Sequence, residues 1–458
     1  MKEYRNPTLK MSLTINGYRI SKKDVSNLHH LKGILTVKPY IPSVFVKPQY
    51  VARYPVYLES DDSIYVPKHY GIAEFGDYTA STREVSKTDA KFWEFAGSLR
   101  ETQHAVVNSF LSPIPRDGIL SLQTGGGKTV CALYIASKIQ LPTLVLVHNT
   151  FLRDQWIDRI KAFLPKARIG SVQGDILDIE NKDVIVGMLQ SISMKEYPVS
   201  TFKSIGLVIV DECHHIASEA FSKAIPKITS KHMLGLSATP ERKDKLMYVI
   251  NWFLGPLLYK SDTSDKVDEA VKVEVYEFEP EDPKYNDVIY NQSGVMFTSL
   301  MINKVAEYDP RNIMLAELME DVIEDTTRQL LVLTDRVEHT KILFEKLKDS
   351  AKEKACILGR DVKPAVRAEW CATKKILIAT YSMCKEGFDV ATLNTLLIAT
   401  PRPDVDQIVG RILRVDKDLR SVHPLILDVV DPAFRRQFQE RLALYKKRSY
   451  KIEKMKLA

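Results

Sequence analysis

Residues 121–130 read SLQTGGGKTV, with three consecutive glycines ahead of one lysine and one threonine. The apolar run GILSL (118–122), typical of a buried strand, precedes the glycines, and a helical pattern, VCALYIASKI (130–139), follows them. Glycines let the backbone curl so that successive N–H groups point at one anion, and the start of a helix adds positive potential. The stretch therefore predicts a phosphate-binding loop between a strand and a helix.

Within such a loop, Lys128 is expected to reach the terminal phosphates and Thr129 to hold Mg²⁺. The strict G-x-x-x-x-G-K-[ST] pattern is not met, because Leu122 stands where the first glycine would be. A glycine-rich turn with no ligand therefore stays open as an alternative while the loop is considered alone. The other candidate nucleotide contacts in the loop are Thr124, Gly125, Gly126 and Gly127.

Composition narrows the class of protein. A chain of 458 residues is too long for one ordinary core and predicts two to four domains, and 45% hydrophobic with 27% charged residues is typical of globular proteins. The start, MKEYRNPTLK, lacks the apolar region of a signal peptide, and no uncharged apolar run approaches the roughly 20 residues that span a bilayer. We expect a soluble cytoplasmic protein. Five scattered cysteines, never in a C-x-x-C pair, argue against a disulfide framework or a zinc site.

Near-continuous apolar runs, the pattern of strands buried on both faces of a parallel sheet, occur in two sets. They lie at 118–122, 142–147, 183–188, 205–210 and 233–238, and again at 330–335, 355–358, 375–380, 395–400 and 424–430. Helical patterns lie between them; in FLRDQWIDRIKAFL, for example, Leu152, Trp156, Ile160 and Phe163 form one stripe that can cover a sheet. The order predicts an α/β protein with two doubly wound parallel-sheet lobes.

Domain boundaries follow from the same patterns. The composition of residues 1–90, rich in Tyr, Val and Pro, predicts a small, mainly β accessory domain that is a candidate for DNA binding. The two lobes are expected at residues 91–260 and 311–434. The turn-rich segment between them, residues 261–310, is interpreted as a linker and an excursion. The segment 435–458 is a basic tail with nine Lys or Arg and two Glu. A solvated helix and a phosphate contact both stay open for this tail.

A second motif, LVIVDECHH (207–215), ends an expected strand with two acidic residues. Ligands bind at the carboxyl edge of parallel sheets, so Asp211 is suited to holding Mg²⁺ and Glu212 to orienting a water that attacks the γ-phosphate. Zinc binding by Cys213, His214 and His215 is disfavoured, because adjacent ligands point to different faces. We interpret His214 as a relay between the nucleotide and neighbouring loops.

TGGGKT (124–129), DECH (211–214), SAT (237–239) and QIVGRILR (407–414), in this order, resemble the motor motifs of superfamily 2 helicases over roughly residues 90–430. The resemblance implies two RecA-like lobes with ATP and Mg²⁺ in the cleft between them. LRETQ (99–103) resembles the adenine-reading element and nominates Gln103. The resemblance also places Gly387 and Asp389 near the nucleotide, and it gives Ser237 and Thr239 a coupling role, although a local helix cap stays open for SAT.

The motif QIVGRILR has a specific physical use. Arg411 and Arg414, three apart on an expected helix, would share one face and stabilise charge on the transferred phosphoryl group from the opposite lobe, with Gln407 beside them. The resemblance further implies nucleic-acid contacts at His148, Asn149 and Arg153 in VHNTFLRDQW, Gln190 in MLQSI, Thr334 and Arg336 in TDRVEH, and Thr380 in ATYSMCKEGFDV.

The segments after SAT, PERKDK and FLGPLLYK, resemble those of DNA-translocating members such as the XPB-like, RecG-like and phage UvsW-type helicases. This implies a monomeric viral or phage enzyme, in the host cytoplasm, that unwinds or remodels branched DNA (forks, junctions, R- or D-loops) in replication, recombination or repair. A duplex-tracking translocase or RNA helicase in viral transcription stays open, as does an annealing protein switched by nucleotide. Two roles stay open for five tyrosines of the N-terminal segment: stacking on bases of a nucleic acid, or packing in the core of a small β domain. They are Tyr18, Tyr40, Tyr50, Tyr54 and Tyr57.

Overall fold

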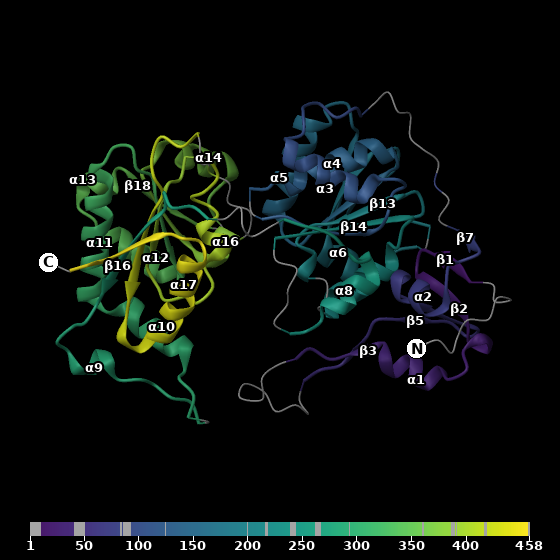
Figure 1. Ribbon diagram of the computed structural model, residues 1–458, viewed down its shortest axis with the longest axis horizontal. Helices are drawn as coiled ribbons and strands as arrows, with labels where there is room; N and C mark the ends of the chain where they lie inside the picture. The colour runs from purple at the N-terminus through teal and green to yellow at the C-terminus, as the bar shows by residue number, and fades with distance from the viewer. Residues whose placement is uncertain are drawn as a thin grey trace. The chain divides into compact units, whose positions relative to one another are not determined.

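The computed structural model divides into two units, Met1–Ser261 and Asp262–Ala458, each described here by itself (Figure 1). The described residues are 11–40, 51–82, 85, 93–123, 125–198, 200–215, 219–238, 244–261, 267–292, 294–359, 361–385, 390, 392–415 and 419–456. Within these residues, none of the helices combines the length and the apolar character that crossing a membrane requires.

An eight-stranded sheet forms the centre of the first unit, in the order β11-β10-β12-β9-β13-β14-β8-β15. Neighbouring strands are parallel, except that β11 runs antiparallel to β10. The strands are β8 (Gly118–Ser121), β9 (Thr143–Val147), β10 (Ile169–Gln173), β11 (Ile176–Asp178), β12 (Val184–Met188), β13 (Leu207–Val210), β14 (His232–Ser237) and β15 (Leu257–Lys260). The five strands predicted for this lobe are confirmed; β10, β11 and β15 were missed, since their apolar runs are short or interrupted.

Helices cover both faces of this sheet (Figure 1). They are α3 (Glu101–Leu111), α4 (Lys128–Ile139), α5 (Thr150–Phe163), α6 (Leu189–Met194), α7 (Glu219–Ala224) and α8 (Met247–Leu254). Buried side chains of α3, α4 and α5 share one core with one face of the sheet, and those of α6 and α8 share another with the opposite face. Because both faces are covered, the strands read as continuous apolar runs.

The described residues of 11–82 form a small, mainly β layer that packs on this lobe. Its sheet has the order β5-β6-β2-β1-β7. The elements are β1 (Ser12–Thr14), β2 (Gly17–Ser21), α1 (Leu28–Ile34), β3 (Thr36–Val37), β4 (Tyr54–Pro55), β5 (Leu58–Glu59), β6 (Ser63–Val66), α2 (Lys68–Phe75) and β7 (Ala80–Ser81). Lys68 Nζ lies 2.6 Å from Asp117 Oδ2 across the junction, and both side chains are only 5% exposed. This layer and the lobe therefore share a buried interface.

The tyrosines of this layer are mostly structural. Tyr18 and Tyr54 are buried, and Tyr57 packs against the same core, so the base-stacking reading is wrong for Tyr18 and Tyr54. The physical reason is that both rings pack in the apolar core that this layer shares with the lobe, where Tyr18 stacks on Phe75 of α2. Tyr40 is exposed, and Tyr50 lies outside the described residues.

A seven-stranded, parallel sheet forms the second unit, in the order β18-β19-β17-β20-β21-β16-β22. Its strands are β16 (Lys272–Glu277), β17 (Leu330–Thr334), β18 (Ala355–Leu358), β19 (Ile376–Thr380), β20 (Thr395–Ile398), β21 (Leu425–Val430) and β22 (Lys451–Met455). The five strands predicted here are confirmed, and β16 and β22 are additional.

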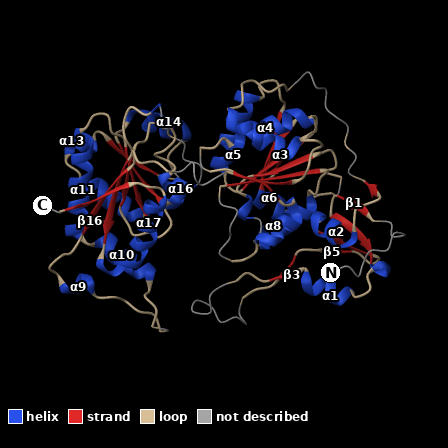
Figure 2. Cartoon of the chain, viewed as in Figure 1, coloured by secondary structure: helices blue, strands red, loops and turns tan. Residues whose placement is uncertain are grey.

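The helices of the second unit again lie on two faces, with α11 and α13 on one and α16 and α17 on the other (Figure 2). They are α9 (Pro283–Asn286), α10 (Thr298–Glu307), α11 (Asp309–Glu324), α12 (Val337–Lys346), α13 (Asp349–Lys352), α14 (Pro364–Thr373), α15 (Tyr381–Lys385), α16 (Asp406–Val409) and α17 (Arg435–Lys447).

Two segments differ from their expected roles. The stretch read as linker, 261–310, contributes β16, which pairs with β21 on one side and β22 on the other. The stretch read as a basic tail, 435–458, supplies α17 and β22. Arg441 of α17 is 1% exposed and forms an ion pair with the fully buried Asp428, with Nη2 2.7 Å from Oδ1. The C-terminal segment is therefore part of this unit's core.

Candidate active site

The loop after β8 has the backbone geometry of an anion cradle. Gly125 and Gly127 have φ angles of 84° and 80°, in the left-handed region. Gly127 caps the start of α4, and a Cβ added there would lie 2.1 Å from Gln103 Nε2. The positive φ makes any residue with a Cβ strained at this position, and the N–H groups at the start of a helix favour an anion such as a phosphate group.

Gln103 lies against this loop. Its Nε2 donates to the carbonyl oxygen of Gly126 at 3.4 Å, and its Oε1 accepts from the backbone N–H of Arg100 at 3.0 Å. The side chain is 5% exposed. Gln103 thus ties the start of α3 to the loop, and the reading of adenine by this residue stays a prediction.

The paired acidic residues lie at the end of β13, facing the loop lysine. Lys128 Nζ donates to Glu212 Oε1 at 3.2 Å. Asp211 is 8% exposed; its Oδ1 accepts from the backbone N–H of Glu212 at 3.0 Å, and its Oδ2 accepts from Trp156 Nε1 at 2.8 Å. Glu212 has a φ of 47°, which is uncommon for a residue with a Cβ and is one of the strained conformations that cluster at functional sites.

The charges of the paired carboxylates, Asp211 and Glu212, suit the binding of a cation. Burial, and then the charge of Glu212, raise the pKa of Asp211 to about 6, although Lys128 and two hydrogen bonds oppose the change. Within the described residues, no cluster of three or more His, Cys, Asp or Glu side chains forms a metal cage. One carboxylate and the hydroxyl of Thr129, in the first turn of α4, are the oxygen donors that suit Mg²⁺, which usually keeps waters and substrate phosphates as its other ligands.

His214 lies between the acidic pair and the end of β14. Its Nδ1 is 3.3 Å from Glu212 Oε2 and 3.1 Å from Ser237 Oγ. This arrangement links Ser237 to the residue expected to orient water, and the coupling role of both residues stays a prediction. Thr239 lies outside the described residues.

The candidate strand-gripping residues of the first unit gather where the adjacent strands β9 and β12 end. Gln190 Nε2 donates to the carbonyl oxygen of His148 at 2.6 Å, and Asn149 Nδ2 lies 3.3 Å from His148 Nε2. Asn149 also caps α5, since its Oδ1 accepts from the N–H of Leu152 at 2.8 Å. Arg153 contacts the carboxylate of Asp154, with its Nε donating at 2.9 Å.

The candidate nucleic-acid contacts of the second unit differ from one another in burial and in hydrogen-bond partners. Thr334 is fully buried and its hydroxyl lies 2.7 Å from His339 Nδ1, so direct contact with nucleic acid is wrong for this residue as the structure stands. The apolar pattern of β17 continues through Thr334, which explains its burial. Arg336 donates through Nε to Asn303 Oδ1 at 2.5 Å. Thr380 caps the next helix, accepting from the N–H of Met383 at 3.3 Å.

The arginines of QIVGRILR do not share a helical face. The helix α16 carries Gln407 but ends at Val409, so Arg411 lies in the turn that follows it and Arg414 lies beyond that turn. That expectation is wrong because the α-helical bonding ends at Gly410: the N–H groups of Arg411 and Ile412 donate to the carbonyl oxygens three residues back, at 2.9 Å and 3.1 Å. Burial raises the pKa of the Cys384 thiol, and the nearby charges of Arg411 and Arg414 oppose this, so both guanidinium groups lie near one buried thiol. Thr124, Gly387 and Asp389 lie outside the described residues.

Two residues were not nominated from the sequence, Trp156 and Arg402, although their side chains contact acidic residues at the strand ends. Trp156 was read only as core, although a buried indole N–H usually needs a partner, which was the available signal. Arg402 stacks 4.7 Å from the ring centroid of Tyr381 and lies 3.4 Å from Asp335 Oδ1, at the ends of β20 and β17. No local pattern marks Arg402.

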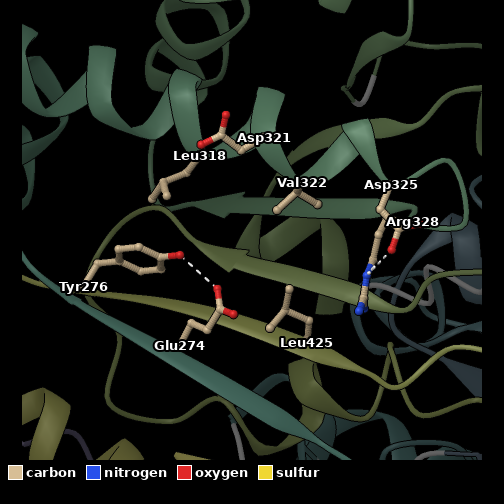
Figure 3. Close-up of a pocket in the computed structure, with 8 residues that line it drawn as sticks. All are labelled: Glu274, Tyr276, Leu318, Asp321, Val322, Asp325, Arg328 and Leu425. Carbon is tan, nitrogen blue, oxygen red and sulfur yellow. Dashed lines mark hydrogen bonds and ion pairs between the residues drawn. The ribbon is translucent and has the colours of Figure 1, made fainter. Parts of the chain in front are cut away.

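A separate cavity of about 240 Å³ opens in the second unit (Figure 3). Tyr276 donates to Glu274 Oε2 at 2.9 Å inside it, and Arg328 Nε lies 3.3 Å from Asp325 Oδ2. Its lining residues are Glu274, Tyr276, Leu318, Asp321, Val322, Asp325, Arg328 and Leu425. The cavity lies near the beginnings of β17 and β21, whereas the motif residues follow the strand ends, so it is not part of the candidate active site.

Known proteins resemble this chain in sequence and in fold. Residues 96–242 match the family model described as "Type III restriction enzyme, res subunit". The chain is 30% identical over 458 residues to "Putative ATP-dependent RNA helicase L396" of Acanthamoeba polyphaga mimivirus, covering 97% of this chain and 87% of that protein. A structure of S. cerevisiae Dbp5 bound to RNA and ADP BeF3 matches with a TM-score of 0.54 at 16% identity, over 78% of this chain and 89% of that chain.

The crystal structure of T4 UvsW covers 98% of this chain and 100% of its own, at 18% identity and a TM-score of 0.38. That score is too low to support the finer resemblance to UvsW-type enzymes. The Dbp5 match shows the fold alone, which is the two-lobed RecA-like architecture. Because the mimivirus relative aligns over nearly the whole length, this chain belongs to the ATP-dependent superfamily 2 helicases, with two RecA-like lobes and a mainly β N-terminal region.

Proposed function

We propose that this chain is a nucleic-acid-stimulated ATPase that couples hydrolysis of ATP to ADP and phosphate, with Mg²⁺, to the remodelling of branched DNA. The observation that carries the ATPase proposal is the pairing of the loop lysine with the acidic motif. Lys128 Nζ lies 3.2 Å from Glu212 Oε1, and Asp211 is buried next to that pair. A phosphate cradle, a cation and two carboxylates thus meet at one sheet edge.

The residues of the first unit divide the work as follows. Gly125, Gly126 and Gly127 surround the phosphates. The N–H groups of Gly125 and Gly127 donate to them, while the N–H of Gly126 holds the loop by donating to the carbonyl oxygen of Gln123 at 3.0 Å. Lys128 turns from Glu212 to the terminal phosphate, which releases Glu212 to orient a water. Mg²⁺, held by Thr129 and Asp211, would neutralise charge on the phosphates.

The second unit would supply Arg411, Arg414 and Gln407 to the charge that develops on the transferred phosphoryl group. An arginine in this role is worth about 10³ to 10⁵ in rate. Gly387 and Asp389 are proposed nucleotide contacts of the same unit. His214, Ser237 and Thr239 would report the state of the nucleotide to the nucleic-acid path.

For the nucleic-acid path, we propose His148, Asn149, Arg153 and Gln190 in the first unit. Arg336 and Thr380 would continue the path in the second unit. Hydrogen bonds from such polar side chains to phosphate and sugar hold a strand without reading its sequence.

Branched DNA is proposed as the substrate because the segment after SAT resembles DNA-translocating helicases. RNA is a second candidate, since the mimivirus relative is named as an RNA helicase. Phosphate release should be measured in parallel with single-stranded DNA, forked DNA, four-way junctions and RNA. Greater stimulation by forks and junctions supports the proposal, and RNA stimulation equal to or above these would replace DNA with RNA as the substrate. We also propose that this protein acts on that substrate as a monomer in the host cytoplasm.

Two substitutions test the ATPase assignment. Lys128→Ala should abolish turnover in a folded protein, and Glu212→Gln should bind ATP and nucleic acid but hydrolyse little. Lys138→Ala is a matched control, because Lys138 lies in the last turn of the same helix, 5.0 Å from the ring centroid of Tyr134. Normal turnover in folded Lys128→Ala protein would remove the loop assignment.

A further inference from the structure

The indole of Trp156 makes an unusual contact for a core side chain. Trp156 is 1% exposed and packs in the core under α3, α4 and α5. Its Nε1 donates at 2.8 Å to Asp211 Oδ2, which is the carboxylate proposed to hold Mg²⁺. A buried indole N–H needs an acceptor, but here the acceptor is a group of the active site.

The hydrogen bond restricts how the Asp211 carboxylate can turn. Asp211 Oδ1 accepts from the backbone N–H of Glu212 at 3.0 Å, and Oδ2 accepts from Trp156. Rotation of the carboxylate would break one bond or both. Each carboxylate oxygen can accept more than one partner, so both retain capacity for a further ligand while their plane is fixed.

The helix that carries Trp156 begins at the candidate nucleic-acid contacts. Asn149 caps α5 through the N–H of Leu152 at 2.8 Å, and the carbonyl oxygen of His148 accepts from Gln190. Trp156 lies six residues beyond the first residue of α5, about 9 Å along the helix axis at 1.5 Å per residue. A shift of the start of α5 therefore moves the indole, because a short helix moves as one piece.

We propose that Trp156 is a positioning residue that couples nucleic acid at the start of α5 to the orientation of the Asp211 carboxylate. The inference rests on the proposed function, since it takes Asp211 as a magnesium ligand and His148 and Asn149 as nucleic-acid contacts. Nucleic acid bound at these residues displaces α5, and the indole carries that displacement to Asp211. Hydrolysis then depends on the presence of a strand.

Trp156→Phe separates this role from packing. Phenylalanine keeps an aromatic ring in the core and removes the N–H donor. Trp93→Phe is the matched control, because Trp93 is fully buried in the same core. Both variants should first be shown to be folded by circular dichroism.

Steady-state ATPase assays across a magnesium titration, with and without single-stranded DNA or RNA oligonucleotides, give the first readout. In Trp156→Phe the Mg²⁺ concentration for half-maximal turnover should rise by about tenfold or more, because a hydrogen bond to a charged group is worth on the order of 10- to 100-fold. The stimulation by oligonucleotide should also fall towards onefold. Trp93→Phe should keep both values. Values for Trp156→Phe within about twofold of Trp93→Phe would overturn the inference.

A second readout uses the wild-type chain and does not depend on the folding of Trp156→Phe. The chain has four tryptophans, so fluorotryptophan labelling gives four ¹⁹F resonances, with Trp156 assigned by elimination through Phe variants of Trp93, Trp252 and Trp370. The Trp156 resonance should move on addition of Mg-ADP and again on addition of oligonucleotide. A Trp156 resonance that responds to neither addition sinks the inference. A wild-type protein without ATPase activity would instead refute the proposed function itself.

Discussion

Replacement of Arg441 by alanine should destabilise the second unit strongly. Arg441 Nε and Nη2 lie 2.9 Å and 2.7 Å from the two oxygens of Asp428, and Nη1 donates at 2.8 Å to the carbonyl oxygen of Arg402. Tyr445 donates to the same carboxylate at 2.8 Å. Burial by itself would lower the pKa of Arg441, but Asp428 raises it above its usual value, so the guanidinium remains charged.

The expected magnitude follows from the burial of both partners. Asp428 is fully buried, and removal of one partner from a buried pair leaves an uncompensated charge that costs about 3–5 kcal/mol. This is a large part of the roughly 5–15 kcal/mol that stabilises a domain. Arg435 lies in the same helix and pairs with Glu279, but both side chains are more than half exposed. Arg435→Ala should therefore cost only about 0–1 kcal/mol.

Hydrogen exchange read by mass spectrometry on the full chain can localise the loss. Peptides that cover β16 and β22 should exchange roughly 100-fold faster or more in Arg441→Ala, because each 1.4 kcal/mol is a factor of about ten in an opening equilibrium. The same peptides in Arg435→Ala should match the wild type. Equal exchange in the two variants would show that α17 contributes little to the core and would restore the solvated-tail reading.

Two further outcomes concern other parts of the chain. Burial, with the charge of Arg311, lowers the pKa of His339 from 6.5 to about 3. Between these pH values the unfolded chain binds a proton at this residue and the folded chain does not. The free energy of unfolding should therefore fall as pH drops below 6.5, by about 2 kcal/mol at about pH 5. Urea midpoints should show this fall in the wild type and not in His339→Gln, and an equal fall in both would contradict it. Gly127→Ala places a Cβ at a residue whose φ is 80°, and this backbone strain should weaken ADP binding about tenfold. Gly33→Ala, with open space around it and no positive φ, should leave ADP binding unchanged. Unchanged ADP affinity in Gly127→Ala would count against the cradle.

Local patterns in the sequence determined the α/β class, ten strands of the two large sheets and the positions of the loop and acidic motifs. Glycines between a strand and a helix, followed by a lysine and a threonine, indicate a phosphate-binding loop, and strands buried on both faces are apolar throughout, so both signals lie within a few residues. The parallel order then implies that Asp211, at one strand end, lies on the same sheet edge as Lys128, after another.

Only the tertiary structure decided which distant residues meet. Trp156 and Asp211, 55 positions apart, share a hydrogen bond because α5 packs over β12 and β9, and β13 is the next strand of the sheet. β16 was missed because its buried Val273 and Val275 alternate with charged residues, and only pairing with β21 shows which side faces the core. The charge of Arg441 looked like surface in the sequence, since burial of a charge depends on a partner such as Asp428 that packing alone brings within reach.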